Sequence, residues 1–312
     1  MRLERLLRYL LIAGIFSTIF VTTNQAEAIS LSPLTFELAV NPGEVVTNVL
    51  KITNTDAVPV NVTIKTEDFA AIGEEGQVTL EEPTEDLTFS SARWVTANPS
   101  VLVLLPNESA TIEFVISVPA NAEPGGHYSS ILATVSAAAT QGGGSSIAQQ
   151  VGSLILINVA GDVTENLRIE EFFAAGYSEY GPVGIISRFE NDGTVHLKPR
   201  GFILIKNIFG KEIAKLDLPQ RNVLPRSIRR IEVPWGEKIM FGRYEATLTA
   251  IYGSTNQPLS SVTSFWVIPW KITTAVAIGL IALLSFFIKG RKRIRLALSV
   301  LFRGTHRLQG LN

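Results

Sequence analysis

Short runs that alternate between apolar and polar residues dominate the chain between residues 29 and 270. Such alternation places successive side chains on opposite faces of an extended strand, so that one face of each run can be buried. No stretch in this part has helical periodicity over three turns. Many short strands with evenly spaced turns predict an all-β sandwich. Examples are the runs 49–53, 60–64 and 111–116, and the turns Asn41-Pro42-Gly43, Pro124-Gly125-Gly126 and Asn191-Asp192-Gly193.

The pattern occurs twice along the chain. Pro106 and Pro225, which each precede a similar strand, are 119 residues apart, and Tyr128 and Tyr244 are 116 residues apart. The segment 54–56 (Asn-Thr-Asp) likewise matches 191–193 (Asn-Asp-Gly). An offset of this size is the length of one immunoglobulin-like domain. We therefore expect an all-β protein with two tandem immunoglobulin-like β-sandwich domains plus one C-terminal transmembrane α-helix.

The boundary between the domains is expected near residue 163, with domain 1 over 29–163 and domain 2 over 164–268. Residues 136–150 are rich in Ala, Gly, Ser and Gln, a composition typical of linkers. In the second copy, however, the strand 244–252 turns and returns toward Ile268. The equivalent hairpin in the first copy joins 128–137 to 147–159. The three glycines at 142–144 are then an exposed hairpin tip and not a hinge.

Each predicted domain has enough apolar strand positions to form a core without disulfides. In domain 1 we expect buried side chains at Phe36, Val40, Leu50, Ile52, Val62, Ile64, Leu87, Phe89, Trp94, Ile112, Phe114, Ile116, Tyr128, Ile131 and Ala133. In domain 2 we expect them at Phe172, Ile185, Phe189, Phe202, Leu204, Leu224, Ile231, Tyr244, Ala246, Leu248 and Ile251.

Residues 1–28 have the three parts of a secretory signal peptide. Arg2, Arg5 and Arg8 precede an apolar stretch over 9–21, and Ala26-Glu27-Ala28 is an A-x-A cleavage site. The apolar stretch is short for a membrane span. Cleavage after Ala28 is expected, and the alternative is a retained N-terminal anchor.

A second apolar run, 270–288, is long enough to cross a bilayer, and Lys271 is its only charged residue. Trp266 and Trp270 lie at its start, where amphipathic rings favour the membrane interface. The following cluster of basic residues predicts retention on the cytoplasmic side. We expect a transmembrane helix over 269–289, a basic cytoplasmic tail over 290–312 and an N-terminus outside the cell membrane. The one-sided basic flank disfavours the alternative of a buried core helix.

The formal net charge of -1 hides an uneven distribution. Residues 29–270 carry 16 basic and 26 acidic side chains, whereas 271–312 carry eight basic and no acidic ones. The tail can therefore lie on anionic inner-leaflet lipid through Arg291, Lys292, Arg293 and Arg295, or it is a solvated stop-transfer tail. The charge gives no indication of a nucleic-acid partner.

The composition excludes several kinds of chemistry. There is no cysteine, which excludes disulfides, thiolate metal sites and cysteine nucleophiles. His127 and His196 fall in different predicted domains, so no histidine metal site is expected. The acidic stretch 74–86 could supply oxygens to calcium but lacks the usual ligand spacing, so a solvated acidic loop is favoured. We predict no enzyme activity, no catalytic or metal residues and no cofactor.

The motifs resemble those of a known group of bacterial proteins. Residues 40–44 (Val-Asn-Pro-Gly-Glu), 105–109 (Leu-Pro-Asn-Glu-Ser), Val118-Pro119 and 122–128 resemble bacterial immunoglobulin-like surface domains of the WxL-interacting type. Proteins of that type have a signal peptide, two tandem β-sandwiches, one C-terminal membrane helix and a short basic tail. The resemblance implies binding of peptidoglycan and of WxL surface proteins, without naming binding residues.

The leading hypothesis is a membrane-anchored extracytoplasmic binding or scaffold protein that recognises a cell-wall polymer or another surface protein. One alternative is a chaperone-like assembly factor for envelope proteins, which requires a long unpaired strand edge. Another is a structural subunit of a membrane complex.

Overall fold

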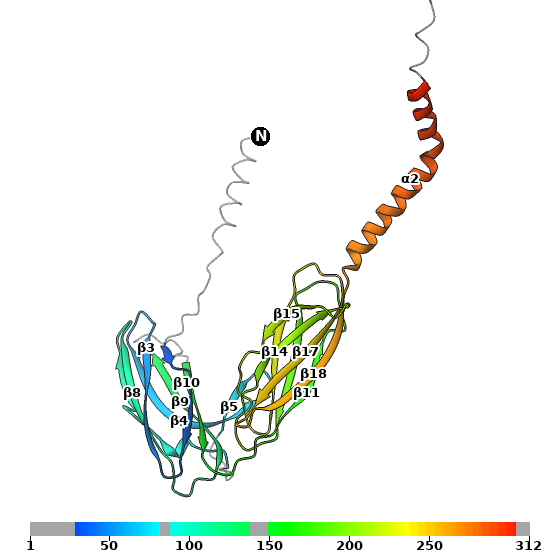
Figure 1. The fold of residues 1–312 in the computed structure, drawn as a ribbon. Helices are drawn as coiled ribbons and strands as arrows, with labels where there is room; N and C mark the ends of the chain where they lie inside the picture. Colours follow the sequence, from blue (N-terminus) through cyan, green and yellow to red (C-terminus); the bar gives the residue numbers. More distant parts are fainter. Residues whose placement is uncertain (1–28, 82–87, 138–148, 304–312) are drawn as a thin grey trace, which may run out of the picture. The chain divides into compact units, whose positions relative to one another are not determined.

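The computed structural model describes residues 29–81, 88–137 and 149–303 (Figure 1). The predicted signal peptide, the triple glycine and Leu87 lie outside these ranges. The described chain is almost entirely β-strand, with one long C-terminal helix. Its contacts define two compact units, which separate between Val163 and Thr164. One segment, Ala71–Gln77, belongs to the second unit although it lies within the sequence of the first.

The first unit contains two sheets. One has the order β1 (Ile29–Ser32), β3 (Val45–Asn54), β8 (Ser109–Ser117), β6 (Val95–Asn98). The other has the order β2 (Thr35–Val40), β10 (Gln149–Val159), β9 (Gly125–Ala137), β4 (Val60–Ile72), β5 (Gln77–Glu81), and β7 (Val101–Leu104) also pairs with β4. A short 3-10 helix, η1 (Ala92–Trp94), precedes β6.

The core of the first unit comes from alternate positions on the strands, as period-2 patterning requires. Leu50 and Ile52 on β3, and Ile112, Phe114 and Ile116 on β8, are fully buried. The ring of Phe114 packs edge-on against that of Phe36, with centroids 5.0 Å apart. The hairpin expected on either side of the triple glycine is present as β9 paired antiparallel with β10.

The second unit also contains two sheets (Figure 1). One has the order β11 (Leu167–Ala174), β13 (Val183–Asn191), β16 (Ser227–Trp235). The other has the order β12 (Tyr177–Ser178), β18 (Gln257–Val267), β17 (Gly242–Tyr252), β14 (Arg200–Asn207), β15 (Glu212–Asp217). The expected hairpin with a turn at 253–256 is β17 and β18.

Part of the predicted core of the second unit is wrong by one residue. On β14 the buried side chains are Ile203 and Ile205, whereas Phe202 and Leu204 lie on the partly exposed face. On β17, Ile251 is 37 % exposed and its neighbours are buried. Residues 202–205 are a continuous apolar run, so the alternation does not specify which face is buried.

The two units share a buried asparagine at the end of one strand. Asn54, at the end of β3, donates from Nδ2 to the carbonyl oxygens of Val58, Leu104 and Leu105, and its Oδ1 accepts from the N–H of Asp56. Asn191, at the end of β13, is also fully buried. It donates to Val195 and Val223 and accepts from the N–H of Gly193. The match between 54–56 and 191–193 therefore marks a common structural element.

The last element, α2 (Trp270–Arg303), follows β18 after two residues. Its segment Trp270–Lys289 is long and apolar enough to cross a membrane, and it is not buried in the protein. The helix does not end near residue 289, as the expected boundary implied, but continues through the basic cluster. Lys and Arg have high helix propensity, so nothing in this cluster except Gly290 opposes the helix.

Candidate interaction surfaces

His127 and His196 lie in separate units. The described residues contain no group of three His, Asp or Glu side chains placed to bind a metal ion. His127 is buried, with its ring centroid 4.5 Å from that of Trp94. Its Nε2 and Nδ1 face the carbonyl oxygens of Glu123 and Ser90, at 2.9 and 3.2 Å. His127 therefore contributes packing and hydrogen bonding within the first unit, while His196 lies in the second.

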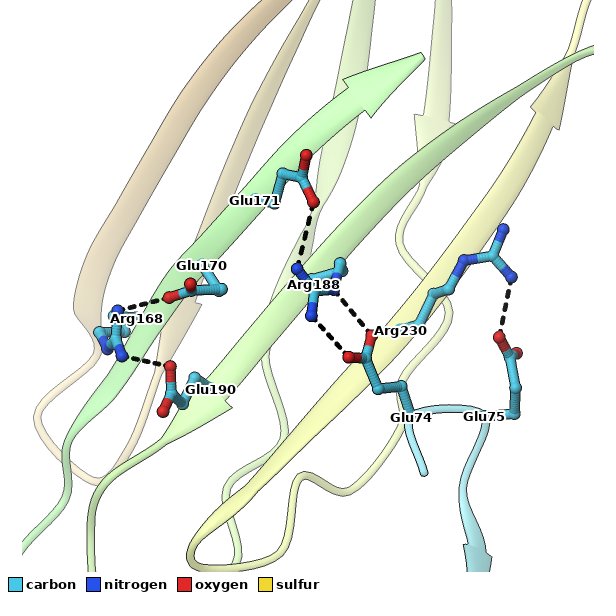
Figure 2. A network of polar contacts seen from close by, with 8 residues as sticks. All are labelled: Glu74, Glu75, Arg168, Glu170, Glu171, Arg188, Glu190 and Arg230. Atoms are coloured by element: carbon cyan, nitrogen blue, oxygen red, sulfur yellow. Dashed lines mark hydrogen bonds and ion pairs between the residues drawn. The ribbon is translucent and has the colours of Figure 1, made fainter. Parts of the chain in front are cut away.

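The acidic stretch that we considered for calcium begins in the turn between β4 and β5. This turn, Ala71–Gln77, lies against the sheet β11–β13–β16 within the second unit. There Glu74 and Glu75 bind arginine side chains (Figure 2). Glu75 is 56 % exposed, as a solvated loop predicts, whereas Glu74 is only 32 % exposed, and both carboxylates are paired with arginines. Glu82, Glu85 and Asp86 lie outside the described residues.

Three arginines of the second unit, which we call the arginine clasp, hold this turn: Arg188, Arg229 and Arg230. Arg188 on β13 donates two hydrogen bonds to the Glu74 carboxylate, at 2.7 Å from Nε and 2.5 Å from Nη2. Arg230 on β16 donates from Nη1 to Glu75 at 2.9 Å. The backbone N–H of Arg230 also donates to the carbonyl oxygen of Glu74, at 2.8 Å. The turn thus covers part of the outer edge of β16.

Glycine makes this close approach possible. Gly73 and Gly76 both have positive φ, +60° and +84°, which side chains with a Cβ rarely adopt. A Cβ at Gly76 would lie 1.3 Å from Nη1 of Arg229, so the guanidinium rests directly on the turn. Burial lowers the pKa of Arg229, and its Nε has no hydrogen-bond partner.

The positive charges of the arginine clasp explain why a turn with two glutamates binds there. Arg188 and Arg230 are directly opposite each other on neighbouring strands, where two like charges repel. The Glu74 and Glu75 carboxylates, with Glu171 on Arg188, neutralise this pair (Figure 2). The hydrogen bonds from Arg188 lower the pKa of Glu74, and those same bonds raise the pKa of Arg188. A general acid needs the opposite shift, a raised carboxyl pKa.

A second ion-pair group continues along the same face. Arg168 on β11 pairs with Glu170 at 2.5 Å and with Glu190 (Figure 2). It also pairs with Asp192 at 3.1 Å. These bonds, chiefly that to Asp192, raise the pKa of Arg168. The arginines of this face are therefore paired with carboxylates of the same chain.

One open strand edge in the first unit is β7. Its register with β4 pairs Leu102 and Leu104 with Val62 and Val60. Because the N–H of Ile64 donates to Ser100 in the same ladder, Val101 and Val103 point their backbone groups away from β4. Val101 and Val103 are 63 % and 61 % exposed, and Leu105, which follows, is 58 % exposed. An exposed apolar edge strand is a template for pairing with another chain.

Another open edge among the described residues is at the start of β10. Leu154 donates from its N–H to Leu34, beside β2, and the pairing with β2 begins at Leu154. Gln150 and Gly152 direct their backbone groups to the same side, where no described strand lies. Longer strand edges are open in the second unit. Among the described residues, β18 pairs with β12 only at Trp266 and Val267, and β11 pairs only with β13, so the assembly-factor alternative stays open.

Sequence reasoning predicted no site residue, and it missed the clasp. Glu74 and Arg188 are 114 residues apart, and no local pattern connects them. The one available signal was the Gly73–Gly76 pair flanking two glutamates, which indicates a tight turn but not its partner. Lipid binding by Arg291, Lys292, Arg293 and Arg295 concerns side chains outside the described set and stays a prediction.

Comparison with known proteins finds no matching family profile and no matching curated protein. Among solved structures, a chaperone–tip adhesin complex of CFA/I fimbriae biogenesis contains a chain that is 13 % identical. It matches with a TM-score of 0.39 over 76 % of this chain and 99 % of its own. The class 5 fimbriae chaperone CfaA is 12 % identical, with a TM-score of 0.38 over 75 % of this chain and 98 % of its own. The YadV chaperone is 11 % identical, with a TM-score of 0.38 over 77 % and 100 %. Similarity this low carries no information on function.

Proposed function

We propose that this chain is a single-pass membrane protein of the cell envelope that binds an extended apolar segment of another surface protein along β7, without catalysis. The observation that carries the proposal is the open edge of β7, with its exposed Val101, Val103 and Leu105. An added strand would satisfy the free backbone groups and cover the apolar side chains in one step.

The membrane part of the proposal rests on α2 and its flanks. The exposed apolar surface of Trp270–Lys289 needs lipid or protein to cover it, and the charged cluster that follows is basic. Together with the signal-like residues 1–28, this arrangement supports a topology with both units outside the cell membrane and the C-terminus inside.

The remaining alternatives for the function differ in what the chain binds and in whether the partner stays bound. A receptor or scaffold, including one of the WxL-interacting type, keeps its partner, whereas an assembly factor releases a client segment. A structural subunit of a membrane complex contacts its partners in every purified copy. Recognition of a wall polymer would not use backbone pairing at β7.

The test uses the full chain in nanodiscs to capture envelope proteins extracted from the membrane fraction. Val103→Pro removes the outward-pointing N–H of residue 103 together with its branched side chain. Val103→Ala removes the branched side chain but keeps the N–H. We expect capture of a protein by the natural chain, weaker capture by Val103→Ala and none by Val103→Pro. Equal capture by all three chains, or retention of purified wall polymer alone, would overturn binding at β7.

Two further measurements complete the test. Hydrogen exchange of the captured complex should show new protection at the amides of Val101 and Val103. Resistance of the natural chain to alkaline carbonate extraction tests the membrane anchor separately. Release of the chain from membranes by carbonate would contradict the anchor whatever happens at β7.

A further inference from the structure

One end of the second unit, which we call the helix-side end, gathers the loops that lie beside the start of α2. Ladder pairs place the ends of six strands there: Asn207 with Tyr244, Gly242 with Val267, Tyr177 with Trp266 and Val183 with Trp235. The loops at this end are therefore the connection 175–182, the turn 207–211 between β14 and β15, and the turn 236–241 between β16 and β17.

These loops expose large apolar side chains. Phe209 is 89 % exposed, and Phe241, Ile239 and Ile208 are 68 %, 62 % and 61 % exposed. Tyr177, Trp270 and Trp266 at the same end are also about half exposed. Scattered apolar residues on a surface need no explanation, but a cluster of this kind marks an interaction site.

The opposite end of the same sandwich has a different character. Its turns carry polar groups such as Glu165, Ser254 and Asn256, with Glu165 bound to the Ser254 backbone and side chain. The large apolar side chain exposed there is Ile251, at 37 %. The apolar side chains are thus concentrated at the end from which α2 departs.

Hydrogen bonds fix the start of α2 to the helix-side end. The Tyr177 hydroxyl donates to the carbonyl oxygen of Ile268 at 2.9 Å, and the N–H of Ile268 donates to Ser178 at 3.0 Å. Lys271, in the first turn of α2, pairs with Glu179 at 3.0 Å. A bilayer that surrounds Trp270–Lys289 must therefore present its headgroup layer to these loops.

The charges at this end are mixed. A hollow of about 140 Å³ is lined by Lys206, Ile208, Arg243, Tyr244 and Glu245. Lys211 and Lys238 add positive charge nearby, and Glu212 and Glu237 offset it. Because the two signs nearly balance, the apolar and aromatic side chains must provide most of the affinity for any partner. Aromatic side chains beside a membrane helix favour the lipid–water interface.

We propose that the helix-side end rests on the lipid bilayer, with Phe209 and Phe241 inserted into the headgroup layer of the leaflet on the side of the two units. This inference rests on the membrane anchor of the proposed function. It adds a second contact, so that the anchor is a helix together with a docked domain surface rather than a helix alone.

The absence of cysteine makes a direct test simple, because single cysteines can be labelled without background. We would label Phe209→Cys, Thr255→Cys and Leu280→Cys with the same fluorophore. Each full chain is placed at one copy per nanodisc of phosphatidylcholine and phosphatidylglycerol. Quenching by doxyl-labelled lipid reports lipid contact, and quenching by iodide reports water contact. Thr255 is the matched exposed control at the opposite end, and Leu280 lies in the predicted span.

We expect lipid quenching at Phe209 to exceed that at Thr255 at least about threefold, with the reverse order for iodide. Equal quenching at the two positions would overturn the proposal. The label at position 209 could instead be shielded from iodide without being quenched by lipid, or be shielded only when two copies share a nanodisc. Either result would assign the surface to a protein partner and overturn the proposal. No lipid quenching at Leu280 would instead show that the membrane anchor itself is wrong.

A second set of variants removes the influence of the label at position 209. A label at Lys238→Cys should lose its lipid quenching when Phe209→Ser and Phe241→Ser are combined. Ile213→Ser, which changes an exposed apolar residue of β15, should leave that quenching unchanged. Unchanged quenching in the double variant would show that the two phenylalanines do not hold this end on the membrane.

Discussion

The two units end an equivalent strand in the same way and then diverge. Both place an asparagine with no exposed surface at that end, and both use it to bind carbonyl oxygens of a later segment. In the first unit the bond to Leu104 spans 50 residues, and in the second the bond to Val223 spans 32. The segment between the asparagine and its later partner is thus 18 residues longer after Asn54 than after Asn191, and it includes the turn Ala71–Gln77, which packs within the second unit. The shared element is a polar anchor, and the segment between its ends is free to vary.

The apolar cores differ more than the polar anchors. In the first unit the fully buried Phe114 packs against Phe36, and the buried Tyr128 contacts Phe69 and Phe89, with ring centroids 5.9 and 6.3 Å apart. In the second, Phe265 lies in a cluster with Trp235 and Tyr244, with ring centroids 5.0–6.0 Å apart. A core requires volume and apolar character, which different residues can supply, whereas a buried amide has to match particular carbonyl groups.

The largest expected effect is therefore loss of a core ring in either unit. Phe114→Ala and Phe265→Ala should each lower the free energy of unfolding of their own unit by about 3–5 kcal/mol, because each leaves a cavity. Hydrogen exchange on the full chain, followed unit by unit, measures this. The matched control is Phe202→Ala, on the partly exposed face of β14, which should cost well under half as much. An equal loss of unfolding free energy in Phe202→Ala would show that Phe202 belongs to the core, and would contradict its position on the partly exposed face of β14.

The next effect tests the shared anchor. Asn54→Ala and Asn191→Ala each remove two or more hydrogen bonds from Nδ2 to backbone carbonyl oxygens, and each leaves the amide that donates to Oδ1 without its acceptor, which should cost about 2–4 kcal/mol in the affected unit. Exchange of the Asp56 amide in one case and of the Gly193 amide in the other should accelerate, since each donates to the lost Oδ1.

An isosteric control separates the loss of the hydrogen bonds donated by Nδ2 from the loss of side-chain volume. Asn54→Asp and Asn191→Asp keep the shape but place an oxygen where Nδ2 faces the carbonyl groups. These variants should be at least as damaging as the alanine variants. If an aspartate variant matched the natural chain in stability, the donated hydrogen bonds would not be the shared anchor, and the resemblance of the two segments would be one of shape alone.

Much of the fold follows from local pattern. Period-2 runs and turn residues predict the strands and the two hairpins β9–β10 and β17–β18, because these interactions are close in sequence. The face of β14 could not be predicted from a run of four apolar residues, since burial there depends on the opposing sheet. The match of 54–56 with 191–193 was visible, but its meaning depends on carbonyl groups 32 to 50 residues away.

The interaction surfaces could be predicted only in part. The anchor helix could be predicted because the length and apolar composition of a membrane span are properties of one continuous segment of sequence. The arginine clasp does not, because Glu74 and Arg188 meet through tertiary structure across 114 residues. The exposed apolar residues Val101 and Val103 look in the sequence like any half-buried strand, and only the sheet order shows that they form an edge.

A smaller effect concerns the turn Ala71–Gln77, which comes from the sequence of the first copy but belongs to the second unit. Gly76→Ala should weaken docking of the turn, because the new Cβ displaces the Arg229 guanidinium and the positive φ adds strain of about 1–2 kcal/mol. The readout is faster exchange of the Arg230 amide, which donates to Glu74. Gly73→Ala, in the same turn, is the matched control, with φ +60° and only Gln77 Oε1, at 3.4 Å, near the new Cβ. Equal acceleration in both variants would show that backbone strain, and not contact with Arg229, is responsible.

The smallest effect is the pH dependence of the same turn. Arg188 lowers the pKa of Glu74 below its ordinary value of 4.5, so the ionised carboxylate stabilises the docked turn at every pH above that value. This contribution is lost as the pH falls through the lowered pKa of the docked state. Protection of the Arg230 amide, corrected for the intrinsic exchange rate, should therefore decrease over that range. Glu74→Gln should show less protection at neutral pH and no such dependence, whereas Glu212→Gln, on β15, should behave like the natural chain. The same pH dependence in Glu74→Gln would assign the titration to another carboxylate of the clasp, because the turn would then respond without its bidentate partner.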